Sequence, residues 1–231
     1  MFDCRSRLRP AAFPDIAQEL AARDSINSGM SDRDFEDVGA VWVLARMKIE
    51  YLSYPGRYDP PVTVRTWHKG LNGLYFIRDY QMLAPDGRAM INATSSWVFM
   101  DPVNRKLVRS ENFVGKVNVD SDCPLSAIDE PASKIVIPRD AELRGEGSHI
   151  VCYSDLDYNG HVNNARYPVW ALYLLPYELS MESTLRSLEI NFSREAHLGE
   201  KVEIRHFFCD GFHYIEGLEN GLCVFVARLG F

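Results

Sequence analysis

Apolar and polar residues alternate strictly near the C-terminal end of the chain. In SLEINFS, at residues 187–193, every second residue is apolar: Leu188, Ile190 and Phe192. A period of two predicts a strand with one face buried. EKVEIRHFF repeats the alternation at residues 200–208. FHYIEGLENGLCVFVARLG then predicts two further strands joined by a tight turn at Asn220-Gly221.

The first half of the chain contains the same series of elements. Strands are predicted at residues 45–54, 62–68, 74–83 and 89–100, and the last two are joined by a turn at Pro85-Asp86-Gly87. Each half also has an apolar helix candidate before its strands. These helices are expected at residues 15–22, after Pro14, and at about residues 164–179.

The two series are related by one offset, which indicates a duplication. Met47 begins an apolar alternation that matches the one at Leu188, an offset of 188 − 47 = 141. We therefore expect an α+β fold of two repeats, each with a sheet wrapped around one helix, packed as a pseudo-dimer. The expected boundaries are 1–115 for the first repeat, 116–134 for a linker rich in proline and charge, and 135–231 for the second repeat.

Composition excludes several classes of protein. The net charge of −7 is the opposite of what a general nucleic-acid binder carries. The five cysteines are odd in number and contain no Cys-x-x-Cys pair, which argues against a disulfide framework or a zinc site and favours a reducing compartment. No stretch approaches the roughly 18 apolar residues of a membrane span, and the N-terminus has no apolar signal core. These features predict a cytoplasmic protein.

Polar residues are concentrated in SDLDYNGHVNN, between a predicted strand and the second helix. Asp155, Asp157, Asn159 and Gly160 stand at positions 1, 3, 5 and 6 of the calcium-loop pattern. Position 12 should be a bidentate glutamate but is Arg166, and a strand rather than a helix precedes the loop. The sequence therefore argues against calcium.

A plain turn is the simpler interpretation of this stretch. Asp, Asn and Gly form turns readily, and Asn163 or Asn164 would make a good N-cap for the second helix. The first repeat, however, has no such cluster where its helix begins. The offset also places Glu195 opposite Tyr54, since 195 − 54 = 141. Because both repeats have similar folding needs, the asymmetry favours chemistry in the second.

The residue types suit hydrolysis. A carboxylate and a histidine can activate water and protonate a leaving group, and the start of a helix can stabilise an oxyanion. A carboxamide such as Asn159 can orient the water or polarise a carbonyl. The chain has neither a G-x-S-x-G nucleophile turn nor a glycine-rich phosphate loop.

The motifs together resemble the acyl-acyl-carrier-protein thioesterases of bacteria and plant plastids. The resemblance rests on DYNGHVNN before an aromatic-rich helix and on LEINFSREA ending near Glu195, supported by WVLARMKIEYLSYP, VTVRTW and SSWVFMD in the first half. It implies a tandem hot-dog fold and hydrolysis of fatty acyl-acyl carrier protein to a free fatty acid, which ends chain elongation. It also implies a first repeat that shapes the acyl pocket, no metal or organic cofactor, and the catalytic set Asp157, Asn159, His161 and Glu195.

Two departures from the family pattern affect these expectations. Plant members commonly have a cysteine after the glutamate, but here the residue is Ala196, so carboxylates, imidazole and water must do the work. The chain also begins close to its first helix, so the opening strand of the first repeat is expected to be short or missing. The lack of a transit peptide favours a bacterial, cytoplasmic member. Asp157 could orient its neighbours or attack the thioester through a transient anhydride, and the sequence leaves both open.

Three alternatives share this fold. A coenzyme A thioesterase would use the same chemistry on another carrier, whereas a non-catalytic sensor would bind an acyl thioester without turnover. A dehydratase is expected to place its histidine and carboxylate across a subunit interface, which the duplicated single chain fits poorly. The acyl carrier protein is acidic, so basic residues near the pocket mouth would favour it as partner. Chain-length preference and pairing into a homodimer are left open. Trp42, Trp97 and Trp170 suit either the pocket or the core.

Overall fold

The computed structural model describes residues 1–31, 33–35, 39–109 and 123–231. Among them, the helices are α1 (Ala12–Asn27), α2 (Arg166–Tyr173), α3 (Tyr177–Glu182) and the short 3-10 helix η3 (Tyr153–Asp155). The strands are β1 (Val41–Tyr51), β2 (Thr63–Asn72), β3 (Tyr75–Leu83), β4 (Ala89–Asp101), β5 (Lys106–Val108), β6 (Glu142–Ile150), β7 (Ser187–Phe192), β8 (Lys201–Cys209), β9 (Phe212–Glu219) and β10 (Leu222–Gly230).

One antiparallel sheet carries both repeats. Its strand order is β2-β3-β4-β1-β7-β10-β9-β8-β6, and β5 pairs with β4 beside this path. At the centre, where β1 meets β7, Met47 lies opposite Ile190 and Ile49 lies opposite Leu188. A two-fold rotation about the paired Lys48 and Glu189 superposes Met47 on Leu188, which is the offset of 141 found in the sequence. The architecture is that of two hot-dog repeats in tandem.

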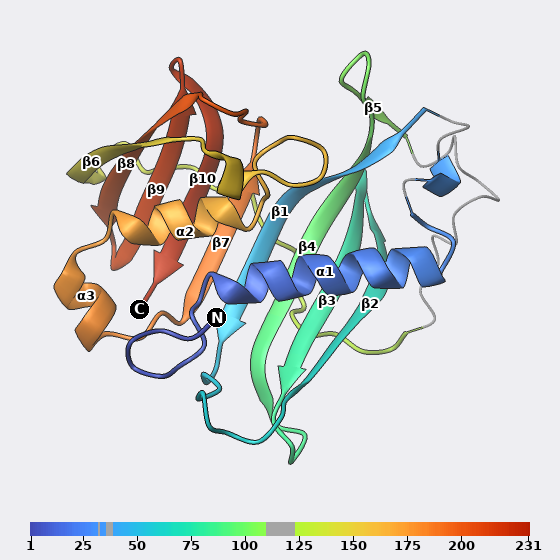
Figure 1. Cartoon of the computed structure of the whole chain (residues 1–231), viewed down its shortest axis with the longest axis horizontal. Coiled ribbons are helices and arrows are strands. Elements are labelled where there is room, and N and C mark those ends of the chain that lie inside the picture. The colour runs from blue at the N-terminus through green and yellow to red at the C-terminus, as the bar shows by residue number, and fades with distance from the viewer. Residues whose placement is uncertain (32, 36–38, 110–122) are drawn as a thin grey trace.

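Both long helices lie across the same face of the sheet, one over each half (Figure 1). Their N-terminal ends meet near the middle, where Arg166 of α2 forms an ion pair with Asp15 of α1 (Nη2–Oδ2 2.6 Å). α1 begins earlier than predicted, at Ala12, because Pro14 falls in the first turn, where its missing N–H needs no partner. None of the described helices is long and apolar enough to cross a membrane.

The second helix is shorter than predicted. The expected helix over residues 164–179 is divided into α2 and α3, and Pro176 stands directly before α3. A proline inside a helix removes a hydrogen bond and clashes with the preceding turn, so a continuous helix cannot pass this point. Pro168 is tolerated because it falls in the first turn of α2. The predicted N-cap is also wrong, because Ala165 occupies it. The Asn163 side chain accepts a hydrogen bond from the Ala165 N–H (2.9 Å).

The apolar alternation places one face of the sheet against the helices. The core between them contains residues of both repeats, among them Phe13, Ile49, Ile91, Tyr167, Leu188, Ile215 and Phe225. A smaller cluster beside the first repeat is aromatic: Trp42 packs against Phe35, Phe76 and Phe99. Trp170 is buried in the main core, and Trp97 lies at its edge.

The segments outside the repeats differ in part from expectation. Of the predicted linker, 116–134, residues 116–122 lie outside the described residues. Its described part contacts both halves of the sheet: the Trp67 indole N–H donates to the Leu125 carbonyl oxygen (2.9 Å), and the Asn191 amide of β7 donates to the Ser133 carbonyl oxygen (2.9 Å). The proline- and charge-rich stretch before it contains β5, which was not predicted. No strand precedes α1 among the described residues, as expected, and the first ten residues form only isolated bridges.

Two histidines in the second half of the sheet should make the stability of the folded chain depend on pH. His206 is buried, its Nε2 lies 2.9 Å from Nδ1 of His213, and burial, with His213 and Arg144 nearby, lowers the pKa of His206 from 6.5 to about 4. Burial and Arg144 also lower the pKa of His213. The unfolded chain therefore binds more protons than the folded one between these pKa values. The contribution of these histidines to the free energy of unfolding is fully present above pH 6.5 and is lost as the pH falls toward 4.

We expect the free energy of unfolding to fall by about 2 kcal/mol between pH 7.5 and pH 5 through His206 alone. Urea unfolding at the two pH values measures this change. His206→Gln has no imidazole to protonate, so it should show a smaller pH dependence than the wild type. An equal pH dependence in both proteins would contradict the assignment.

Candidate active site

The predicted catalytic loop is a tight turn held by the Asp157 carboxylate. Its Oδ1 accepts hydrogen bonds from the backbone N–H groups of Asn159 (2.8 Å) and His161 (3.4 Å). The Asp157 N–H donates to the His161 carbonyl oxygen (2.8 Å), which closes the loop. Gly160 has a φ of 78°, a conformation that glycine adopts without strain. Asp157 therefore determines the shape of the loop that presents His161.

Backbone hydrogen bonds fasten this loop to the segment that follows β7. His161 and His197 form an antiparallel bridge, and the Val162 N–H donates to the Ala196 carbonyl oxygen (3.0 Å). The register sets Glu195 beside His161, with 3.5 Å between His161 Nδ1 and Glu195 Oε1. Both side chains are about one third exposed, so the pair is open to solvent.

The first repeat contributes a charged residue to the same place. Arg105, in the turn between β4 and β5, has its Nη1 2.9 Å from Glu195 Oε2. Apart from this ion pair, Oε2 is buried and has no hydrogen-bond partner among the described residues. Arg105 thus places a positive charge beside the Glu195 carboxylate. Oε2 of Glu195 remains able to accept a hydrogen bond, for example from a substrate or a water molecule.

Tyr167 of α2 contacts the segment after β7 that carries Glu195. Its hydroxyl accepts a hydrogen bond from the Ala196 N–H (3.3 Å), next to Glu195. Burial raises the pKa of Tyr167 well above its ordinary value, and the charges of Glu195, Glu200 and Asp157 add to this effect. The phenol therefore stays neutral and acts as a fixed hydrogen-bonding support.

A small hollow, part of it open to solvent, lies between the two helices and the sheet. Residues of both repeats line it: Pro14, Ala17, Gln18, Leu44, Met47, Tyr80, Ser95, Trp97, Asn164, Ala165, Pro168, Ile190 and Phe192. Asn164 follows His161 by three residues and Phe192 precedes Glu195 by three. The same two segments of the chain thus contribute both to the largely apolar lining and to the polar pair.

Two groups of side chains in the described residues could hold a metal ion, because their ligand atoms lie within 4.8 Å of one another. They are His161, Glu195 and His197, and, on the strand side of the loop, His149, Cys152 and Asp155. The first group overlaps the predicted catalytic set. Its imidazole rings, His161 and His197, have centroids 5.0 Å apart.

Comparison with known proteins identifies the family. The Acyl-ACP thioesterase N-terminal domain matches residues 1–114, and the Acyl-ACP thioesterase C-terminal domain matches residues 142–223. The chain belongs to the acyl-ACP thioesterase family. This acyl-ACP thioesterase family member is 33% identical over 202 residues to a chloroplastic acyl-acyl-carrier-protein hydrolase of Cuphea viscosissima, which covers 77% of this chain and 45% of that protein.

Other relatives agree on the family and the fold. The chloroplastic oleoyl-acyl carrier protein thioesterase 2 of Arabidopsis thaliana is 27% identical, covering 82% of this chain and 55% of that protein. The chain thus spans about half the length of these two curated relatives. Two solved structures superpose on 99% of this thioesterase-family chain and 92% of their own. They are an acyl-ACP thioesterase from Bacteroides thetaiotaomicron (TM-score 0.83, 24% identity) and the 12:0-ACP thioesterase from Umbellularia californica (0.85, 19%), and this likeness confirms the tandem hot-dog fold.

The structure brings the predicted residues together to different degrees. His161 and Glu195 are neighbours, and Asp157 is joined to them through the backbone of the loop. Asn159 is exposed, and the atom that ties it to Asp157 is its backbone N–H rather than its amide. The sequence interpretation missed Arg105 and His197. His197, two residues after Glu195, could have been suspected from its spacing. No sequence signal pointed to Arg105.

Proposed function

We propose that the protein hydrolyses the thioester bond of fatty acyl-acyl carrier protein and releases a free fatty acid, ending elongation of the chain. The observation that carries the proposal is the His161–Glu195 pair beside a largely apolar cavity. A histidine and a carboxylate within reach of one another can transfer protons, and the apolar walls suit an acyl chain. Membership of the acyl-ACP thioesterase family supports the substrate class.

The pair can complete the reaction without a covalent intermediate. Glu195 takes a proton from water, whose oxygen attacks the thioester carbonyl carbon. When the tetrahedral intermediate breaks its C–S bond, His161, which enters the reaction as an imidazolium, gives a proton to the leaving thiolate. The proton on Glu195 then passes to His161 across their 3.5 Å contact, which restores both groups. The sum is one thioester and one water converted to one acid and one thiol.

The oxyanion is proposed to lie near the start of α2. This helix begins at Arg166, directly after the cavity-lining residues Asn164 and Ala165. In this turn the Arg166 N–H is bonded to the Asn163 carbonyl oxygen (2.8 Å) and Pro168 has no N–H, so the partial positive charge of the helix start is what would stabilise developing negative charge. A thioester carbonyl bound at this helix start would face the cavity and would lie beside the chain segment that carries His161.

The two repeats are proposed to divide the work. The first, residues 1–115, supplies eight of the thirteen residues that line the cavity, including Met47, Tyr80 and Trp97. The second, residues 135–231, carries the proton-transfer pair. Arg105 crosses this division because it approaches Glu195 from the first repeat. The connection between them is proposed to span residues 116–134.

The carrier is proposed to bind beside Arg105. Exposed Lys106 and Arg109 follow it, and exposed Arg194 precedes Glu195, so basic residues border the site although the whole chain is acidic. An acidic carrier protein would be attracted to this border.

The five cysteine thiols are free, which supports a reducing compartment such as the cytoplasm.

The test is thiol release from matched acyl-acyl carrier protein and acyl-CoA thioesters of several chain lengths. Lys106→Glu should raise KM for the carrier-protein substrate more than for acyl-CoA. Lys134→Glu, an exposed lysine on the connecting segment, is the matched control. Equal use of both carriers would favour the coenzyme A alternative. Binding without thiol release from any substrate would favour the sensor.

Asp157 is proposed to position the loop rather than attack the thioester, since its Oδ1 is already bonded to two backbone N–H groups. Asp157→Asn keeps a carbonyl oxygen that can accept these bonds, so we expect a rate loss of about tenfold or less. Asp157→Ala removes the acceptor and should cost about 10²-fold, because His161 is misplaced. Steady-state thiol release measures both. An Asn variant as inactive as the Ala variant would instead indicate that the carboxylate itself reacts.

A further inference from the structure

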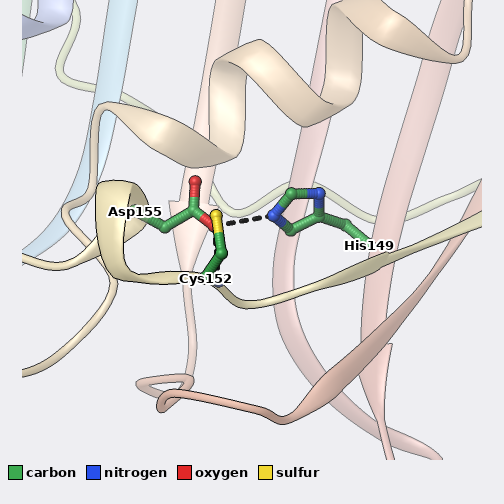
Figure 2. A group of neighbouring side chains, drawn as sticks. All are labelled: His149, Cys152 and Asp155. Carbon is green, nitrogen blue, oxygen red and sulfur yellow. Dashed lines mark hydrogen bonds and ion pairs between the residues drawn. The ribbon is translucent and has the colours of Figure 1, made fainter.

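A second cluster of reactive side chains lies outside the proton-transfer pair. His149 is the second-last residue of β6, Cys152 follows in the connection, and Asp155 is the last residue of η3 (Figure 2). His149 Nε2 lies 2.7 Å from Asp155 Oδ2, and Cys152 Sγ lies 3.1 Å from the same oxygen. The three ligand atoms all lie within 4.8 Å of one another. We propose that His149, Cys152 and Asp155 bind one Zn²⁺ ion.

The order of contacts argues against a nucleophilic triad. In a Cys–His–Asp triad the imidazole lies between the thiol and the carboxylate, so that it can pass a proton. Here the carboxylate lies between the other two, because both Sγ and Nε2 approach the same oxygen of Asp155. The polar atoms of the three side chains converge on one point, as Figure 2 shows, which is the arrangement of ligands around a metal ion.

The ligand types select the metal. A thiolate, an imidazole and a carboxylate are all ligands of Zn²⁺, whereas Ca²⁺ and Mg²⁺ require mostly oxygen. Zn²⁺ bonds of about 2.0–2.3 Å place neighbouring ligand atoms about 3.3–3.6 Å apart in a tetrahedron. Binding would therefore widen the His149–Asp155 contact by about half an ångström and release the thiol proton. Thiolate and carboxylate then balance the charge of the ion.

The three residues are held in place before any ion binds. The Asp155 side chain is 9% exposed and its Oδ2 accepts the Cys152 N–H (2.9 Å). The His149 ring lies against the indole of Trp170 in α2, with centroids 4.4 Å apart. Cys152 is exposed, which gives an ion access and leaves the fourth position to water. The lack of Cys-x-x-Cys argued against zinc in the sequence, but His149 and Asp155 supply the missing ligands.

The site would tie the end of β6 to the catalytic loop. Asp155 is two residues before Asp157, and its carbonyl oxygen accepts the Asn163 N–H (2.8 Å) at the far side of the loop. Zn²⁺ should therefore raise the melting temperature of the whole chain. The proton-transfer pair is a separate group, so the ion is structural and its loss is compatible with residual activity.

The experiment is zinc binding to chelator-stripped full-length protein, followed by metal analysis and thermal melting. We expect the wild type to bind one Zn²⁺ per chain. In Cys152→Ser and in His149→Gln the affinity for Zn²⁺ should fall by about tenfold or more. Cys4→Ser, at another exposed thiol, and His197→Gln, in the other possible metal group, are the controls and should bind as the wild type does.

Cobalt provides a second readout that does not depend on stability. Co²⁺ should give a thiolate-to-metal charge-transfer band in the wild type and in Cys4→Ser, and none in Cys152→Ser. Zinc that is lost in His197→Gln but kept in Cys152→Ser would move the site to the other group and overturn the proposal. Failure of the wild type to bind zinc, or binding unchanged in both ligand variants, would overturn it as well.

Discussion

Glu195→Gln is expected to lower kcat by about 10²–10⁴-fold, the contribution of a well-placed general base. Glutamine has nearly the same shape as glutamate but cannot take a proton from water. It also removes the charge next to His161 Nδ1 and Arg105 Nη1. Because the proposed substrate contacts lie in the cavity and on the basic border beside Arg105, KM should change little. Steady-state thiol release separates the two constants.

Glu200→Gln is the matched control for this substitution. Glu200 lies five residues further on and accepts the His197 N–H (2.7 Å), a bond that a glutamine oxygen can also accept. It should keep the wild-type rate. Both variants should melt at the wild-type temperature. If Glu195→Gln keeps more than about a tenth of the wild-type rate, Glu195 is not the general base and the proton-transfer scheme is wrong.

Phe225→Ala is expected to lower the free energy of unfolding by about 3–5 kcal/mol, the usual cost of deleting a buried aromatic ring. Phe225 is fully buried in β10 and lies directly opposite Gly217 of β9. Its ring occupies the space where a side chain at 217 would be, because a Cβ built there meets Phe225 Cε1 at 2.2 Å. Urea unfolding measures the loss.

Gly217→Ala should therefore be destabilising by itself, by about 1–3 kcal/mol, since the added methyl group and the ring cannot occupy one volume. In the double variant the methyl group enters the space that the ring has left. We expect its cost to be smaller than the sum of the two single costs. Simple additivity would contradict the steric coupling between the two positions.

This packing also bears on activity. The Phe225 ring lies beside Tyr167, with centroids 5.2 Å apart, and the Tyr167 hydroxyl accepts the Ala196 N–H next to Glu195. A cavity at Phe225 would loosen the support of the catalytic segment. We therefore also expect Phe225→Ala to lower the rate of thiol release by the folded protein, through misplacement of Glu195.

The sequence alone predicted much of the fold. Alternation with a period of two located β7 to β10, because a half-buried strand must place apolar residues on every second position. The offset of 141 predicted that β1 and β7 are equivalent strands of a duplicated unit, whereas the pairing of Met47 with Ile190 is seen only in the structure. Helix ends were predicted less well, because the first-turn tolerance of Pro14 and the break at Pro176 depend on position within the helix.

The sequence also singled out the residues of the proton-transfer pair, although not their contact. His161 and Glu195 stood out because the first repeat has no polar counterpart, and Tyr54, the counterpart of Glu195, donates its hydroxyl to the Leu185 carbonyl oxygen instead (2.7 Å). Their distance was set by the bridge between His161 and His197, which joins segments far apart in the chain.

Only the tertiary structure decided which further residues meet. Arg105 reaches Glu195 from the other repeat because the two halves share one sheet, and no local pattern encodes that approach. His149, Cys152 and Asp155 are close in sequence, yet their convergence depends on the turn of η3 and on the ring of Trp170. Local periodicity determines which faces are buried, whereas contacts between side chains depend on how those faces pack.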